Sequence, residues 1–218
     1  SDRTVWNYLS KFTEMNGYFH QVLTKYKGQV YQMPINLETI NAFYKTNFTP
    51  QEAKNFIAKE ITKENIITPK NLEEKAISLI GRPLYEAFIK GYTIKQWEKE
   101  PKKLSADIIN RLPMRFDYKE DYFQNSRWQG VPVDGYTAIF EKQLSSPKIE
   151  IKLNCDYMEH KSKFKVKEKT IFTGQLDQFF NFKFGKLEWR SVDFKKQVIN
   201  YNDFQGTSVM NYAEAVVP

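Results

Sequence analysis

The stretch "TPQEAKNFIAKEIT" (residues 49–62) decides the fold class, because it begins with a complete set of helix-start signals. Thr49 and Glu52 form a capping box, in which each side chain accepts a hydrogen bond from the other residue's backbone N–H. Pro50 stands at the first helical position, where a backbone N–H has no helical partner in any case. The stretch therefore predicts an α-helix.

A second stretch, "NLEEKAISLI" (residues 71–80), repeats this scheme with Asn71 as the cap. Gly81 marks its end, because glycine adopts the backbone conformation that closes a helix. Together the two stretches predict a helical bundle over residues 36–112.

Strand signals lie on both sides of this bundle. Residues 1–35 indicate a helix over residues 4–15 and a β-hairpin that turns at Lys27 and Gly28. After the bundle come short alternating runs typical of strands: "MRFDY", "RWQGVPV", "KIEIKLN", "KSKFKVKEK", "TIFTG", "LEWRSVDF" and "GTSVMNY". Among these runs "DGYTAIFEKQL" favours a helix capped by Asp134. The expected fold class is α+β, a helical bundle with a twisted antiparallel sheet.

Composition excludes several functions. The chain has a formal charge of +7, but only six of its 33 basic residues are Arg, the residue that reads bases and phosphates best, so no nucleic-acid partner is expected. One cysteine, Cys155, excludes an internal disulfide, and the two histidines, His20 and His160, are too few for a zinc site, so no metal is expected. No apolar run reaches the length of a membrane span, and residues 1–10 lack a signal-peptide core. A cytoplasmic location is therefore expected.

Short catalytic motifs are absent, but an aromatic cluster stands out. No two glycines have the G-x-G spacing of a dinucleotide-binding turn, and neither G-x-S-x-G nor H-E-x-x-H occurs. In "FIKGYTIKQW" (residues 88–97), Phe88, Tyr92 and Trp97 are spaced by four and five residues, whereas a core helix repeats apolar residues at three and four. Composition and motifs alone assign no function to this cluster, and for Phe88 a place in the core is an open alternative.

Longer motifs point to a family. "GYTIKQW", "PKKLSADIINRLPMRF" and "DYFQNSRWQGVPVDGYT" follow one another, and the match is extended by "VWNYLSKF", "YKGQVYQMPIN", "LIGRPLYEAFIKGYT", "FTGQLDQFF", "FKFGKLEWRS" and "FQGTSVMNY". Together these motifs resemble the UDP-galactopyranose mutase family over nearly the whole chain. The resemblance is weakest over residues 46–70 and 148–168.

This resemblance implies an isomerase that interconverts UDP-galactopyranose and UDP-galactofuranose through an adduct between the sugar and N5 of reduced FAD. It implies a bacterial flavoprotein of galactofuranose and cell-surface polysaccharide biosynthesis, and it is compatible with a homodimer of the full-length enzyme. The resemblance implies that the flavin carries out the chemistry, while the protein binds UDP and orients the anomeric carbon.

The resemblance also assigns substrate-binding residues, though no catalytic residue. The matching positions are Phe88, Tyr92 and Thr93 for uridine, Trp97 for the start of a mobile loop, Arg111 and Tyr122 for the diphosphate, and Asn211 for the sugar. From the residues alone, Arg115 is an equal candidate for the diphosphate, and the resemblance favours Arg111. His20 stands where relatives usually carry Asn and is a candidate for a flavin or sugar contact, while Trp128 and Gln175 are further departures.

Against the family pattern, the chain begins after the glycine-rich turn that binds FAD and stops before the last substrate-binding stretch. We expect a central fragment with these parts: residues 1–35 (helix and hairpin), 36–112 (bundle with the uridine pocket), 113–130 (strand and mobile loop), 131–182 (remnant of a truncated α/β FAD-binding domain) and 183–218 (antiparallel strands).

Two other functions stay open at this point. A free-standing, non-catalytic UDP-sugar-binding module would have its own start and stop in the gene. A basic nucleic-acid-binding domain would lose affinity for DNA, but not for UDP, steeply with added salt.

The purified 218-residue chain is expected to be colourless and to lack mutase activity even with added FAD and reductant, because its sequence lacks the glycine-rich turn that cradles the pyrophosphate. Absorbance spectroscopy checks this expectation, and a yellow preparation with stoichiometric flavin would contradict it.

Overall fold

The computed structural model describes residues 2–109, 114–123 and 126–214. The chain divides into two compact units, and each is considered by itself. Unit 1 consists of Ser1–Arg3, Asn16–Val131 and Lys195–Pro218, and unit 2 consists of Thr4–Met15 and Pro132–Phe194.

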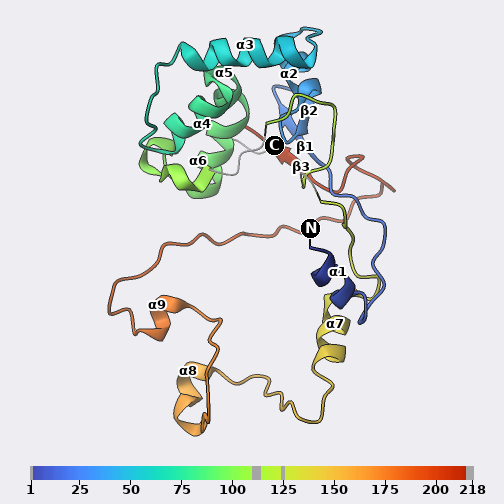
Figure 1. Ribbon diagram of the computed structural model, residues 1–218, viewed down its shortest axis with the longest axis vertical. Coiled ribbons are helices and arrows are strands. Elements are labelled where there is room, and N and C mark those ends of the chain that lie inside the picture. The colour runs from blue at the N-terminus through green and yellow to red at the C-terminus, as the bar shows by residue number, and fades with distance from the viewer. Residues whose placement is uncertain (1, 110–113, 124–125, 215–218) are drawn as a thin grey trace. The chain divides into compact units, whose positions relative to one another are not determined.

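Unit 1 combines a small sheet with a group of helices (Figure 1). Its strands are β1 (Val22–Tyr26), β2 (Gln29–Met33) and β3 (Met210–Tyr212). Its α-helices are α2 (Leu37–Tyr44), α3 (Pro50–Thr62), α4 (Leu72–Ile80), α5 (Arg82–Leu84) and α6 (Gly91–Trp97). A π-helical segment, η1 (Tyr85–Lys90), joins α5 to α6, and the 3₁₀ segments η2 (Pro101–Lys103) and η3 (Ala106–Ile109) follow.

The two predicted helix starts are confirmed. The backbone N–H of Glu52 donates to the Thr49 hydroxyl over 3.4 Å, and the Thr49 N–H donates to the Glu52 carboxylate over 2.8 Å, which completes the capping box of α3. The Asn71 side chain accepts a hydrogen bond from the Glu74 N–H over 3.0 Å at the start of α4. Gly81 ends α4 with a φ of 79°, a value that favours glycine.

The sheet is mixed, which corrects the expected antiparallel arrangement. β1 and β2 form the predicted hairpin with its turn at Lys27 and Gly28, but β3 pairs with β1 in parallel, in the order β2-β1-β3. Alternating side chains predict that a strand exists but not its direction, because a parallel and an antiparallel ladder both use main-chain groups alone. The α+β fold class itself is confirmed.

Most of the other strand predictions for the residues after the bundle are wrong. In the described part of the chain from residue 114 onward, β3 is the one strand. The run "KSKFKVKEK" begins with a 3₁₀ segment, η4 (Lys161–Lys163), and continues without helix or strand. An alternating run needs a neighbouring strand to pair with, and no such neighbour is formed there. The helix expected after Asp134 is present as α7 (Gly135–Gln143), although the Asp134 side chain makes no capping hydrogen bond.

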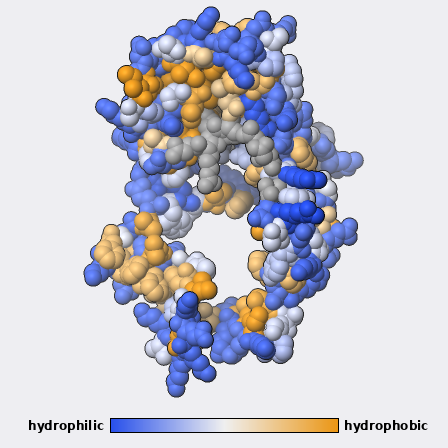
Figure 2. All heavy atoms as spheres, in the orientation of Figure 1, coloured by the Kyte–Doolittle hydropathy of each residue, from blue (hydrophilic) through white to orange (hydrophobic). Residues whose placement is uncertain are grey.

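Unit 2 is built from short helices and irregular segments. Besides α7 and η4 it contains most of α1 (Arg3–Leu9), together with α8 (Tyr157–His160) and α9 (Leu176–Phe179). Large apolar side chains stay exposed there, among them Leu153 at 82% and Phe184 at 80%. Figure 2 shows hydrophobic residues gathered over α9. The expected remnant of an FAD-binding domain over residues 131–182 stays a prediction, as do the other domain bounds.

The buried core lies in unit 1. Its members come from the hairpin, from the turn that follows it, from α2, α3, α4, α5, η1 and from the residue after β3: Tyr31, Ile35, Leu37, Ile40, Ala53, Ile57, Ala76, Ile77, Ile80, Leu84, Tyr85, Ala87, Phe88 and Ala213. Full burial of one such Leu or Ile side chain contributes about 1.5–3 kcal/mol. The cluster therefore holds the helices against the sheet. Over the described residues, no helix is long and apolar enough to cross a membrane.

One capping residue does more than begin a helix. Asn36 is fully buried, and its side-chain oxygen accepts from the Thr39 N–H over 2.9 Å at the start of α2. Its amide group also donates to the Lys119 carbonyl over 3.3 Å. Asn71, at the start of α4, is only partly buried. Among the described residues, the Glu74 N–H is the one hydrogen-bond partner of its side chain.

Asn36→Ala is therefore expected to lower the free energy of unfolding more than Asn71→Ala does. Loss of a cap costs about 0.5–2 kcal/mol, and a buried polar group left unsatisfied costs about 1–3 kcal/mol more. Urea unfolding of the two variants measures the difference. Equal losses would show that the bond to Lys119 contributes nothing.

Candidate functional site

A cavity of about 150 Å³ lies in unit 1. It is lined by residues from β1, β2, η1, α6, β3 and the segment after Arg115: Val22, Thr24, Met33, Pro34, Phe88, Ile89, Tyr92, Tyr122 and Asn211. Four predicted site residues thus meet in one place. Pockets for drug-sized ligands measure about 300–1,000 Å³, so this cavity suits one ring of a ligand rather than a whole nucleotide sugar.

The aromatic cluster seen in the sequence begins in the π-helical segment. A π-helix has wider turns than an α-helix, with hydrogen bonds from i to i+5, and such segments are frequent at functional sites. Phe88 and Ile89 lie in η1, and Tyr92 follows at the start of α6. All three line the same cavity.

Phe88 belongs to the core and to the cavity at once. Its side chain is only 4% exposed. Its ring lies 5.0 Å from that of Tyr31, 5.5 Å from that of Phe43 and 5.7 Å from that of Tyr26, measured between centroids. The place in the core that the sequence left open for Phe88 is therefore confirmed, and its contact with uridine stays a prediction.

Tyr92 supplies a polar group to a mostly apolar wall. Burial raises the pKa of Tyr92 above its ordinary value, and the nearby Tyr122 raises it further. The Tyr92 hydroxyl therefore stays protonated near neutral pH and is able to donate a hydrogen bond.

The parallel pairing of β3 with β1 brings Asn211 to the cavity. Asn211 lies opposite Thr24 in the register, and Thr24 is buried at 2% exposure. The Lys95 ammonium group on α6 donates to the carbonyls of Tyr212 over 2.6 Å and Glu214 over 3.1 Å, and burial lowers the pKa of Lys95. Lys95 thus ties the strand that carries Asn211 to the helix that carries Tyr92.

Tyr122 forms the outer wall and is 41% exposed. Its backbone N–H donates to the His20 carbonyl over 3.0 Å, and the His20 ring meets the Tyr122 ring edge-on at 5.2 Å. The His20 Nδ1 lies 2.9 Å from the Tyr18 hydroxyl, which lies 2.8 Å from the Ser208 hydroxyl. His20 therefore contacts Tyr122 through both its backbone and its ring, and it is not itself among the lining residues. Its flavin or sugar contact stays a prediction.

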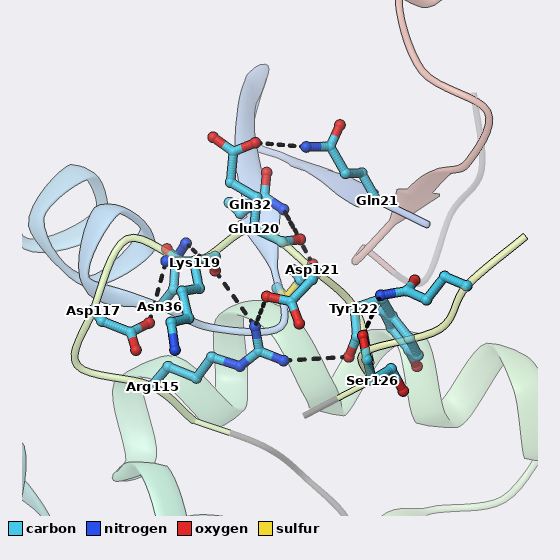
Figure 3. A network of polar contacts seen from close by, with 12 residues as sticks. Gln21, Gln32, Asn36, Arg115, Asp117, Lys119, Glu120, Asp121, Tyr122 and Ser126 are labelled. Carbon is cyan, nitrogen blue, oxygen red and sulfur yellow. Dashed lines mark hydrogen bonds and ion pairs between the residues drawn. The ribbon is translucent and has the colours of Figure 1, made fainter. Parts of the chain in front are cut away.

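The remaining predicted residues lie elsewhere. Thr93 is buried at 5% exposure, and Trp97 is the last residue of α6; neither lines the cavity. Arg111 lies outside the described residues. Arg115 is 4% exposed and forms an ion pair with Asp121, with 3.2 Å between Nη1 and Oδ1 (Figure 3).

Sequence reasoning missed the part of the cavity wall that comes from the hairpin. Val22 and Thr24 are two positions apart and so face the same side of β1, while Met33 ends β2. The alternation of the strand was readable from the sequence, but nothing in it showed which face borders a cavity. In the part of the chain that the structure describes, no group of three or more His, Cys, Asp or Glu side chains is placed to hold a metal ion.

Comparisons with known proteins agree with the resemblance. A family model described as UDP-galactopyranose mutase matches residues 87–218. A probable UDP-galactopyranose mutase of Klebsiella pneumoniae is 40% identical over 217 residues, which cover 100% of this chain and 55% of that protein. The dTDP-fucopyranose mutase of Escherichia coli is 38% identical over 218 residues, which cover 98% of this chain and 57% of that protein.

Among solved structures, a crystal structure of reduced UDP-galactopyranose mutase is similar at a TM-score of 0.35 and 18% identity, over 49% of this chain and 23% of that chain. This structural similarity is too low to add to the sequence comparisons. The chain spans about half the length of the curated relatives it matches. Because the family model covers more than half of the sequence, the chain belongs to the UDP-galactopyranose mutase family.

Proposed function

We propose that the cavity of unit 1 holds the nucleobase of a nucleotide-sugar substrate, in a mutase that interconverts UDP-galactopyranose and UDP-galactofuranose. The observation that carries this proposal is the meeting of Phe88, Tyr92, Tyr122 and Asn211 around a space the size of one ring. These residues come from distant parts of the sequence, and family resemblance had assigned each of them to the substrate.

The side chains that line the cavity suit a nucleobase that is attached to a diphosphate. Stacking of a base on an aromatic side chain contributes about 1–3 kcal/mol, and the hydroxyl of Tyr92 and the amide of Asn211 offer hydrogen bonds that fix orientation. In this proposal the diphosphate leaves the cavity past the exposed Tyr122, with Arg111 as the charged partner. An arginine fork suits a diphosphate because it donates two parallel hydrogen bonds.

The family is flavin-dependent, but the described residues do not fit an FAD site of the dinucleotide-binding kind. Such a site needs a glycine-rich turn between a parallel strand and a helix, whereas the hairpin here turns at Lys27 and Gly28 between antiparallel strands. The flavin supplies the chemistry at the sugar in this family. The part proposed for the present residues is to bind the nucleotide and to orient the sugar.

A second substrate class deserves a direct test, because a relative that acts on a dTDP-sugar is almost as similar as one that acts on a UDP-sugar. Thymine differs from uracil by one methyl group, and the deoxyribose lacks the 2′-hydroxyl. The walls from Val22, Met33 and Ile89 are apolar and do not by themselves exclude a methyl group. A cytoplasmic location, a homodimer and a role in cell-surface polysaccharide biosynthesis stay predictions.

Tyr92→Ala is expected to weaken UDP and uridine binding alike, by about 1–3 kcal/mol, because both ligands carry the base. Arg111→Ala is expected to weaken UDP binding by about 1.5–3 kcal/mol and to leave uridine binding almost unchanged, since it removes a charge-assisted hydrogen bond to phosphate. Calorimetry on the protein expressed from its complete reading frame measures both ligands.

Arg82→Ala serves as the control, because Arg82 pairs with Glu64 and does not line the cavity. An equal loss of UDP and uridine affinity in Arg111→Ala would exclude Arg111 as a diphosphate ligand. If the unaltered protein binds neither ligand at millimolar concentration, the proposed function is wrong.

Titration with UDP, dUDP and dTDP separates the two substrate classes. We expect UDP to bind more tightly than dTDP, and a single methyl group changes such affinities by about 1–3 kcal/mol, which calorimetry resolves. The step from UDP to dUDP isolates the 2′-hydroxyl, and the step from dUDP to dTDP isolates the methyl group. If dTDP binds more tightly than UDP, the proposed substrate is a dTDP-sugar instead of a UDP-sugar, and the proposed nucleotide site stands.

A further inference from the structure

We propose that Arg115 is a positioning residue that orders residues 117–122 and so holds Tyr122 at the cavity, instead of binding the diphosphate itself. This inference rests on the proposed function, because Tyr122 matters only if the cavity takes a nucleotide. It goes beyond the family resemblance, which assigns no role to Arg115.

The Arg115 guanidinium is buried, and both of its Nη atoms contact the chain, whereas its Nε has no hydrogen-bond partner among the described residues. Its Nη1 lies 3.2 Å from the Asp121 carboxylate and 3.5 Å from the Lys119 carbonyl, and its Nη2 lies 3.4 Å from the Tyr122 carbonyl (Figure 3). Its backbone N–H donates to the Ile35 carbonyl over 2.9 Å. A diphosphate would have to displace Asp121 from a side chain that is only 4% exposed.

Residues 117–122 form neither a helix nor a strand, so their backbone groups need other partners. Buried side chains provide several of them: Gln32 donates to the Glu120 carbonyl over 3.1 Å, and Asn36 donates to the Lys119 carbonyl over 3.3 Å. Figure 3 shows these donors and Arg115 converging on the same segment. Arg115 is the one of the three that reaches Tyr122.

Both backbone polar groups of Tyr122 are held in this way. The N–H donates to the His20 carbonyl over 3.0 Å, and the carbonyl accepts from Arg115 over 3.4 Å. The latter distance is long for a neutral hydrogen bond, and the shorter contact to the neighbouring Asp121 provides the charge that keeps the guanidinium in place. Fixing the peptide groups on both sides of the Tyr122 Cα sets the direction of its side chain.

Hydrogen exchange tests the positioning without any ligand. Arg115→Lys keeps the charge but loses the fork, and the matched control Arg82→Lys alters an arginine–carboxylate pair of the same unit with 2.9 Å between Arg82 Nε and Glu64 Oε1. We expect amide exchange in residues 117–122 to become about tenfold faster in Arg115→Lys and to stay unchanged in Arg82→Lys. Unchanged exchange in Arg115→Lys would overturn the proposal. If that variant does not fold, Asp121→Asn tests the same pair.

A double-mutant cycle then separates an indirect from a direct effect on UDP binding. Arg115→Lys is expected to weaken UDP binding about tenfold in the unaltered protein and less than about twofold in the Tyr122→Phe background, because it acts through Tyr122. The same loss in both backgrounds would show a direct contact with the ligand and overturn the proposal. Absence of UDP binding by the unaltered protein would refute the proposed function, while the exchange measurement still decides the role of Arg115.

Discussion

The packing of Phe88 against the hairpin rings is the contact on which unit 1 depends. It joins the helical part to the sheet, since Phe88 lies on η1 while Tyr26 and Tyr31 lie on β1 and β2. The same ring also lines the cavity. One side chain thereby belongs both to the packed core and to the cavity wall, so that part of the wall is as rigid as the core behind it.

Hydrogen bonds from buried side chains hold residues 117–122 in unit 1. A segment without regular structure carries unpaired carbonyls, and here Gln32, Asn36 and Arg115 donate to several of them from buried positions. Each donor is rigid because it is itself packed. Donors from the hairpin, from the start of α2 and from Arg115 thus hold residues 119–122, and Arg115 is the one that reaches Tyr122.

The family relationship and the geometry contribute different parts of the functional argument. Two relatives with different nucleotide sugars in their names are similarly close, so overall identity does not choose the substrate. The geometry contributes a cavity of about 150 Å³ with an aromatic, apolar and amide lining, and the proposed place of the nucleobase rests on that lining.

The sequence by itself determined what depends on neighbours a few residues away. The helix starts at Thr49 and Asn71 and the hairpin turn at Lys27 followed from hydrogen bonds and backbone preferences that are local, and the long motifs determined the family. Only the tertiary structure decided that β3 runs parallel to β1, that Asn211 meets Thr24, and that Arg115 is buried beside Asp121 while Tyr122 lines the cavity. Those relations join segments far apart in the chain, and their free energy comes from burial and pairing that exist only after the whole unit has packed.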